Sequence, residues 1–210
     1  VSIVGAVSPP GCDFSEPVTQ HARRFILCFW ALDTALANAR HYPSIHWLHS
    51  YSEYVEEIGG WWEKQSPDWN EMRTEALTLL QREDRLQQIV KLVGPDALPD
   101  SQRLILFIAE IFKDGFLAQS AFDENDMYCA PEKQVALLRI ILTLYRRGRD
   151  LIQAGAPLAR LRGLACVPLV MRAKSAIGND EKDRLVDLEK RVGEELDLLA
   201  KEFSRKGELK

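Results

Sequence analysis

Residues 66–112, SPDWNEMRTEALTLLQREDRLQQIVKLVGPDALPDSQRLILFIAEIF, decide the fold of this chain. The tripeptide Ser66-Pro67-Asp68 is typical of a helix start, because it supplies an N-cap, a first-turn proline and a first-turn acid. The helix is expected to end at Gly94, where GPDALPDS forms a tight loop, and a second helix is expected to end at about Phe112. The stretch therefore predicts two consecutive helices joined by a short connection.

Helical segments are also expected on both sides of this stretch, because apolar residues recur there at helical spacing and prolines and glycines mark the ends. They comprise a helix from Pro17 to about Arg40, a short helix and a turn within 47–65, a helix from Glu132 to Ala154, short segments up to Gly178, and a helix from about Asp180 to Phe203. The connection at 113–134 is expected to be mainly irregular, with one more helical turn.

The first residues are expected to form a β-strand, because Val1 to Val7 alternate or run apolar as in a buried strand. No partner strand is evident further on, and an isolated strand cannot satisfy its own backbone donors and acceptors. We interpret 1–45 as the remnant of a truncated α/β domain with one strand, a loop and a helix. Residues 46–210 are then a C-terminal helical bundle domain, so the expected class is mainly α.

The composition limits the classes of function. With 210 residues, 46% of them apolar and 28% charged, the chain can bury one substantial core or two small ones. A net charge of -4 without a basic patch argues against nucleic acid as a partner. No apolar run approaches the roughly 20 residues that cross a bilayer. The four cysteines, which lack a CxxC pattern, favour reduced thiols; they are Cys12, Cys28, Cys129 and Cys166.

Familiar catalytic motifs are missing from the sequence. It contains no GxxxxGK[ST], GxGxxG, HExxH or GxSxG, so the chain alone is not expected to be an enzyme. His41, His46 and His49 are close in sequence, but they lack a nearby cysteine or paired carboxylate, which favours ordinary surface or interface histidines over a zinc site. The acidic residues within 181–197 alternate with basic ones and are interpreted as a solvated helix face.

Two aromatic residues are candidates for ligand binding. Tyr42 follows a helix in HYPS, and Phe122 lies in the irregular segment QSAF. Aromatic faces stack on flat ligands, purine rings among them. A shared ligand would explain both rings, whereas the alternative is that each ring simply packs in a separate core.

Several stretches of the chain resemble the catalytic A subunit of the V-type and archaeal A-type rotary ATPases. They are VSIVGAVSPPGCDFSEPVTQ (1–20), FWALD (29–33), RHYPSIHWLHSYSEY (40–54), LLQREDRLQQIVKLVG (79–94) and FLAQSAFDENDMYC (116–129). The resemblance covers residue 1 to beyond 145. It implies that the chain is the end of a nucleotide-binding α/β domain followed by a C-terminal helical domain.

The resemblance also implies site residues. Tyr42, where relatives usually carry phenylalanine, and Phe122 correspond to the two walls of an adenine slot, with Gln119 and Ala121 beside them. The bound molecule would be ATP or ADP with Mg, whose phosphate loop, catalytic glutamate and Mg ligands would lie upstream of Val1. No catalytic or metal-binding residue is therefore expected in this chain, which alone should be inactive.

A contact with the central stalk is implied at two places. GPDALPDS resembles, by its position between two helices, a tip that pushes on the central shaft, with Asp96, Leu98, Pro99 and Asp100 as its contact residues. PPGCDFSEP resembles a loop that approaches the shaft, which implicates Asp13 and Ser15, although Cys12 stands where glycine is usual.

The implied assembly is a proton-translocating rotary ATP synthase. Its partners would be B subunits in an alternating hexamer and the subunits of the central stalk, with the membrane reached only indirectly from a cytoplasmic, peripheral position. Two alternatives stay open at this point: the non-catalytic nucleotide-binding B subunit of the same complex, and a helical protein-interaction module without enzymatic role.

Overall fold

The computed structural model of the chain describes residues 2–9, 11 and 14–207. Its elements follow in the order α1 (Pro17–Arg23), β1 (Cys28–Phe29), α2 (Thr34–Asn38), β2 (Tyr51–Ser52), α3 (Val55–Gln65), α4 (Trp69–Val93), η2 (Pro95–Ala97), α5 (Asp100–Phe112), η3 (Lys113–Leu117), α6 (Pro131–Gln153), α7 (Leu158–Arg162), α8 (Cys166–Ala176) and α9 (Lys182–Gly207). The expected mainly α class is confirmed.

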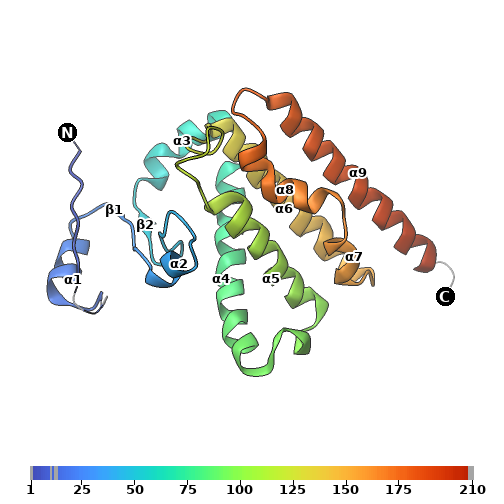
Figure 1. The fold of residues 1–210 in the computed structure, drawn as a ribbon, viewed down its shortest axis with the longest axis horizontal. Helices are drawn as coiled ribbons and strands as arrows, with labels where there is room; N and C mark the ends of the chain where they lie inside the picture. Colours follow the sequence, from blue (N-terminus) through green and yellow to red (C-terminus); the bar gives the residue numbers. More distant parts are fainter. Residues whose placement is uncertain (1, 10, 12–13, 208–210) are drawn as a thin grey trace.

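The helices from α4 onward form one bundle around α6, which contacts α4, α5, α8 and α9 (Figure 1). The face of α6 that points into the bundle is apolar and almost completely buried, with Leu137, Leu138, Ile140 and Ile141 at its centre. α9 covers α6 with an apolar stripe at helical spacing that includes Val192 and Leu196. Burial of these stripes is the main force that holds the helices together.

α4 and α5 form the hairpin predicted from residues 66–112, and its predicted ends are confirmed. Gly94 follows α4 with a φ of 81°, a backbone angle that glycine adopts without a Cβ clash. The short 3₁₀ helix η2 then leads into α5. Figure 1 shows the tip of this hairpin at the opposite end of the bundle from the loop between η3 and α6.

The expected N-cap of α4 is wrong. Ser66 instead ends α3, where its backbone N–H donates to the Trp62 carbonyl, and Asp68 occupies the N-cap position without a side-chain bond to the helix. The Ser66 hydroxyl bonds the Asp68 carboxylate, which lowers the pKa of Asp68, and it accepts a hydrogen bond of 2.7 Å from Arg139 on α6. A tertiary contact has therefore replaced the local cap.

The strand expected at Val1–Val7 is not formed in residues 2–7, which have no regular structure and expose Ile3 and Val4. Val1 lies outside the described residues. Among the described residues no strand lies beside this segment, and a strand needs neighbours to pair its backbone groups. Without a partner strand the backbone groups of this segment cannot pair, and the segment is irregular instead of a strand.

The single helix expected from Pro17 to about Arg40 is also wrong, because the chain forms two shorter helices separated by β1. β1 pairs with β2 in an antiparallel ladder, which places Phe29 opposite Tyr51 with ring centroids 5.7 Å apart. Asp33 then caps α2, since its carboxylate accepts a 2.8 Å hydrogen bond from the Leu36 N–H. Cross-strand aromatic packing and this new cap outweigh the helical periodicity.

The remaining predicted helices are confirmed as α6 and α9, with α7 and α8 as the short segments between them. In 47–65 the turn precedes the helix, and α3 continues through Gly59 and Gly60 without a break. Its continuation brings Trp62 onto Trp69, with stacked rings 4.1 Å apart. The β1–β2 ladder crosses the predicted domain boundary at 45/46, which stays a prediction.

Candidate functional site

Tyr42 and Phe122, the two aromatic candidates, both lie on the surface. Tyr42 follows α2 and is 55% exposed, and Phe122 is 100% exposed in the loop between η3 and α6. Neither ring belongs to the buried core, so the alternative that both simply fill separate cores is excluded. Exposed rings of this kind are free to present their faces to a ligand.

The segments that carry the two rings are joined directly. The backbone N–H of Gln119 donates a 2.7 Å hydrogen bond to the backbone carbonyl of Tyr42, across 77 positions of sequence. The side chain of Gln119 is also engaged, because its amide nitrogen donates to the carbonyl of Asp126 at 2.8 Å. Gln119 therefore holds the loop together, and its neighbour Ala121 is exposed beside Phe122.

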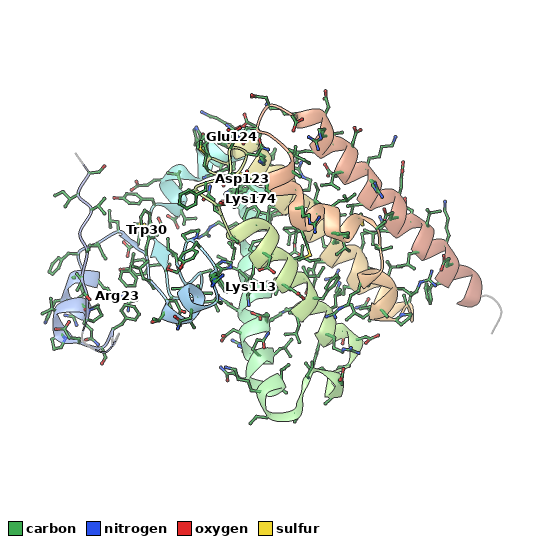
Figure 2. All side chains as sticks on the ribbon, in the orientation of Figure 1. Arg23, Trp30, Lys113, Asp123, Glu124 and Lys174 are labelled. Carbon is green, nitrogen blue, oxygen red and sulfur yellow. The ribbon has the colours of Figure 1, made fainter. Side chains whose placement is uncertain are left out.

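The segment that carries Tyr42 is anchored to the bundle through Trp47. The Lys113 ammonium lies 5.1 Å from the centre of the Trp47 ring, and it forms a 2.7 Å ion pair with the buried carboxylate of Glu83 on α4. Figure 2 shows Lys113 at the junction between the bundle and the N-terminal segments. A cation stacked on indole and paired to a buried acid fixes the position of the first ring's segment.

The three histidines near Tyr42 also belong to this junction. His46 stacks on His49 with ring centroids 3.9 Å apart, and His41 lies edge-on to Trp47. Burial lowers the pKa of both His41 and His46, and the neighbouring His49 lowers that of His46 further. Among the described residues no group of three or more His, Cys, Asp and Glu side chains could hold a metal ion.

The loop that carries Phe122 borders a cavity of about 310 Å³. Its walls combine apolar and polar side chains, among them Phe116, Gln119, Tyr128 and Lys174. The adjacent thiol of Cys129 is partly buried, which raises its pKa above the usual value. The loop is therefore backed by the bundle on one side while Phe122 faces solvent on the other.

The residues expected at the hairpin tip lie in different environments. Asp96 and Pro99 are exposed, whereas Leu98 is buried beneath the tip. Asp100 is half-buried, and its carboxylate accepts a 2.9 Å hydrogen bond from the backbone N–H of Leu158. Leu98 is therefore part of the packed interior and Asp100 joins the hairpin to α7, whereas Asp96 and Pro99 offer the most surface to a partner.

The second expected contact lies near the start of the chain. Ser15 is exposed just before α1, and Asp13 and Cys12 lie outside the described residues. α1, which begins at Pro17, and the hairpin tip between α4 and α5 lie on separate parts of the molecule (Figure 1). Sequence reasoning missed two buried lysines, Lys133 and Lys174, because each has charged or polar neighbours in sequence and no local signal marks it as buried.

Comparison with protein families finds two matches that divide the chain near the β1–β2 ladder. Residues 59–162 match the C-terminal domain of V and A type ATP synthase, and residues 1–52 match the nucleotide-binding domain of the ATP synthase alpha/beta family. A helical bundle preceded by a segment of a nucleotide-binding domain is thus the class that fold and comparison define. More particularly, the chain belongs to the family of the A subunits of V- and A-type ATP synthases.

Individual relatives agree with this assignment. The V-type ATP synthase alpha chain of Halothermothrix orenii is 50% identical over 195 residues, which are 92% of this chain and 33% of the relative. The A subunit of the A-type ATP synthase of Ignicoccus hospitalis is 47% identical, over 95% of this chain and 34% of the relative. That of Methanopyrus kandleri is 45% identical, over 97% and 35%. The chain spans about a third of the length of these relatives.

The comparisons favour the A subunit over the B subunit, since these relatives carry the name of the A subunit or of the alpha chain. They also place the chain in a nucleotide-binding family. Among the described residues, no helix is long and apolar enough to span a membrane.

Proposed function

We propose that this chain supplies the adenine-binding walls and the helical lever of the catalytic A subunit in a proton-translocating rotary ATP synthase. The observation that carries the proposal is the pair of exposed rings, Tyr42 and Phe122, on two segments tied by the Gln119 to Tyr42 hydrogen bond. The rings would stack on the adenine of ATP or ADP, and the ribose and phosphates would extend toward the rest of the nucleotide-binding domain.

The described residues fit the base of a nucleotide better than its phosphates or metal. The exposed rings offer faces for stacking, and the Tyr42 hydroxyl donates at 3.5 Å to the Ala37 carbonyl, away from the ring faces. No group of acidic or histidine side chains among them is suited to Mg. The proposal therefore assigns the Mg ligands, the phosphate loop and the hydrolytic chemistry to the remaining part of a full-length subunit, and expects no turnover from these 210 residues.

The bundle would convert nucleotide binding into movement. One wall of the slot is attached to the bundle, and the hairpin tip with Asp96 and Pro99 lies at the bundle's opposite end (Figure 1). A tilt of the bundle on closure of the slot would therefore displace the tip, which we propose contacts the central stalk, as does the loop near Ser15. B subunits in an alternating hexamer would complete the soluble sector, at the cytoplasmic face of the membrane.

Photoaffinity labelling of the full-length subunit in its complex tests the proposal. After irradiation with 2-azido-ATP, peptide mapping should find the label on the segment around Tyr42 or on residues 118–122, and excess ATP should prevent it. Label confined to other segments would refute the adenine slot. Label on both segments in one experiment would show that both line the same site, as expected if the ring centres lie within about 12 Å of each other.

A further inference from the structure

The loop between η3 and α6 carries Phe122 on residues without helix or strand, so other contacts must hold it. Its first half is attached to the Tyr42 segment by the Gln119 N–H. Its second half turns back on itself, because the Asp123 carboxylate accepts hydrogen bonds from the backbone N–H groups of Asn125 and Asp126. These bonds shape the loop, but they do not fix it to the bundle.

Two sets of contacts attach the loop to the bundle. Asn125 donates to the Ser175 carbonyl on α8 and accepts from the Lys133 ammonium on α6, and Lys174 on α8 holds the chain on both sides of Phe122. The Lys174 side chain is buried, and its ammonium donates hydrogen bonds to the carbonyls of Phe116 at 2.9 Å and Ala118 at 2.6 Å. The same ammonium lies 3.4 Å from the Asp126 carboxylate. Figure 2 shows Lys174 pointing toward the loop that carries Asp123 and Glu124. One cation therefore contacts the chain before and after Phe122.

Asp126 completes the connection across the loop. Its carboxylate is buried, and one oxygen accepts a 2.7 Å hydrogen bond from the Ser120 N–H. Within the described residues the other oxygen has no hydrogen bond and lies 3.4 Å from the Lys174 ammonium. Because Ser120 and Asp126 flank Phe122, the hydrogen bond between them closes the loop at the base of the ring, and the ion pair joins this closure to α8. A buried, charge-assisted arrangement of this kind resists movement more strongly than surface contacts do.

The backbone that enters the loop is also pressed against α8. A Cβ atom at Gly115 would lie 3.2 Å from the Met171 Cα, so a larger residue would push the two backbones apart by a few tenths of an ångström. The close approach brings the carbonyls of Phe116 and Ala118 within reach of Lys174, one helical turn beyond Met171.

We propose that Lys174 is a positioning residue for the base slot: its ammonium, paired with Asp126, sets the place of Phe122 relative to Tyr42. The inference rests on the proposed adenine slot and deepens it. The ammonium touches neither ring, so its effect is confined to the base and leaves the phosphates' binding unchanged. It also makes the slot sensitive to the tilt of α8, since a shift of that helix moves the loop with it.

The test compares two ligands in the full-length subunit within its complex. Lys174→Met keeps the length of the side chain and removes the charge, and it should weaken ATP binding by at least about fivefold, approaching the effect of Phe122→Ala. Affinity for tripolyphosphate, which lacks a base, should stay within about twofold. Lys190→Met is the matched control, because that lysine is exposed on α9 and pairs with Glu194 four residues on, at 3.8 Å.

Each outcome decides the matter. Equal loss for both ligands, or no loss for either, would overturn the role of Lys174, because a positioning role predicts loss for ATP alone. If Lys174→Met does not fold, Asp126→Asn decides by the same comparison, since it removes the ion pair while keeping the side-chain shape. If Phe122→Ala leaves ATP affinity unchanged, the adenine slot itself fails. If Phe122→Ala weakens ATP binding but Lys174→Met and Asp126→Asn do not, only the Lys174 inference fails.

Discussion

Replacing Lys133 by methionine should lower the free energy of unfolding of the chain by about 3 kcal/mol. Lys133 on α6 is only 1% exposed, yet its ammonium donates three hydrogen bonds. They reach the carbonyls of Asn125 at 2.9 Å, Lys174 at 2.7 Å and Ile177 at 2.6 Å. The last two carbonyls lie at the C-terminal end of α8, where a positive charge is favourable.

The magnitude follows from two opposing effects. A hydrogen bond from a charged donor contributes about 1.5 to 3 kcal/mol, and an acceptor left buried without a donor costs about 1 to 3 kcal/mol. Methionine, on the other hand, avoids the desolvation of a buried ammonium, which costs several kcal/mol. The same desolvation lowers the pKa of Lys133 from its usual value. We expect the loss of the three hydrogen bonds to exceed the gain from avoided desolvation by about 3 kcal/mol.

Urea unfolding followed by circular dichroism measures the change. Lys182→Met serves as control, because that lysine is exposed on α9 and lies 3.8 Å from Glu132, so its loss should cost less than about 0.5 kcal/mol. A loss below about 1 kcal/mol for Lys133→Met, or a gain in stability, would show that the buried ammonium is replaceable by apolar packing and would refute the reasoning.

Three further predictions concern pH and close packing. Burial lowers the pKa of His46 below its ordinary 6.5, so the folded chain binds fewer protons than the unfolded chain and should lose stability as pH falls below 6.5. In a plot of melting temperature against pH, His46→Gln should therefore show a smaller decrease toward low pH than the unchanged chain. Gly115→Ala should cost about 1 to 3 kcal/mol, because its Cβ would meet the backbone of Met171, and an unchanged urea midpoint would contradict this. Gly148→Ala should be nearly neutral, because its Cβ would meet the movable side chain of Leu104 at 3.3 Å while alanine favours the helix by up to about 1 kcal/mol; a large loss in the same assay would contradict that.

The sequence predicts the helices of the bundle well because their ends depend on local chemistry. Gly94 ends α4 through its own backbone freedom, and apolar periodicity extends over the whole of α6 and α9. Prediction fails where a distant residue decides the structure. Arg139 recruits Ser66 away from the cap of α4, and Tyr51 pairs with Phe29 to interrupt the expected N-terminal helix.

In the candidate site, too, the local features could be predicted from the sequence and the long-range contacts could not. Tyr42 and Phe122 become candidates from sequence because each stands in an irregular segment, but it is the family resemblance, not the local pattern, that favours a ligand over plain packing. The structure then shows both rings exposed. The residues that hold the Phe122 loop in place could not be predicted from the sequence. Lys174 and Asp126 are far apart along the chain, and only the packing of α8 against η3 brings their charges together.

The central claim, that Phe122 forms a wall of an adenine slot, is tested most directly by the ATP dissociation constant of the full-length subunit in its complex. Because Phe122 is fully exposed, its truncation removes no core packing, and a change in affinity can be attributed to the ligand. Phe122→Ala should weaken ATP binding by about ten- to a hundredfold, since stacking contributes about 1 to 3 kcal/mol per base, whereas Phe122→Trp should retain most of the affinity. An ATP dissociation constant that is the same for Phe122→Ala as for the unchanged subunit would contradict the account.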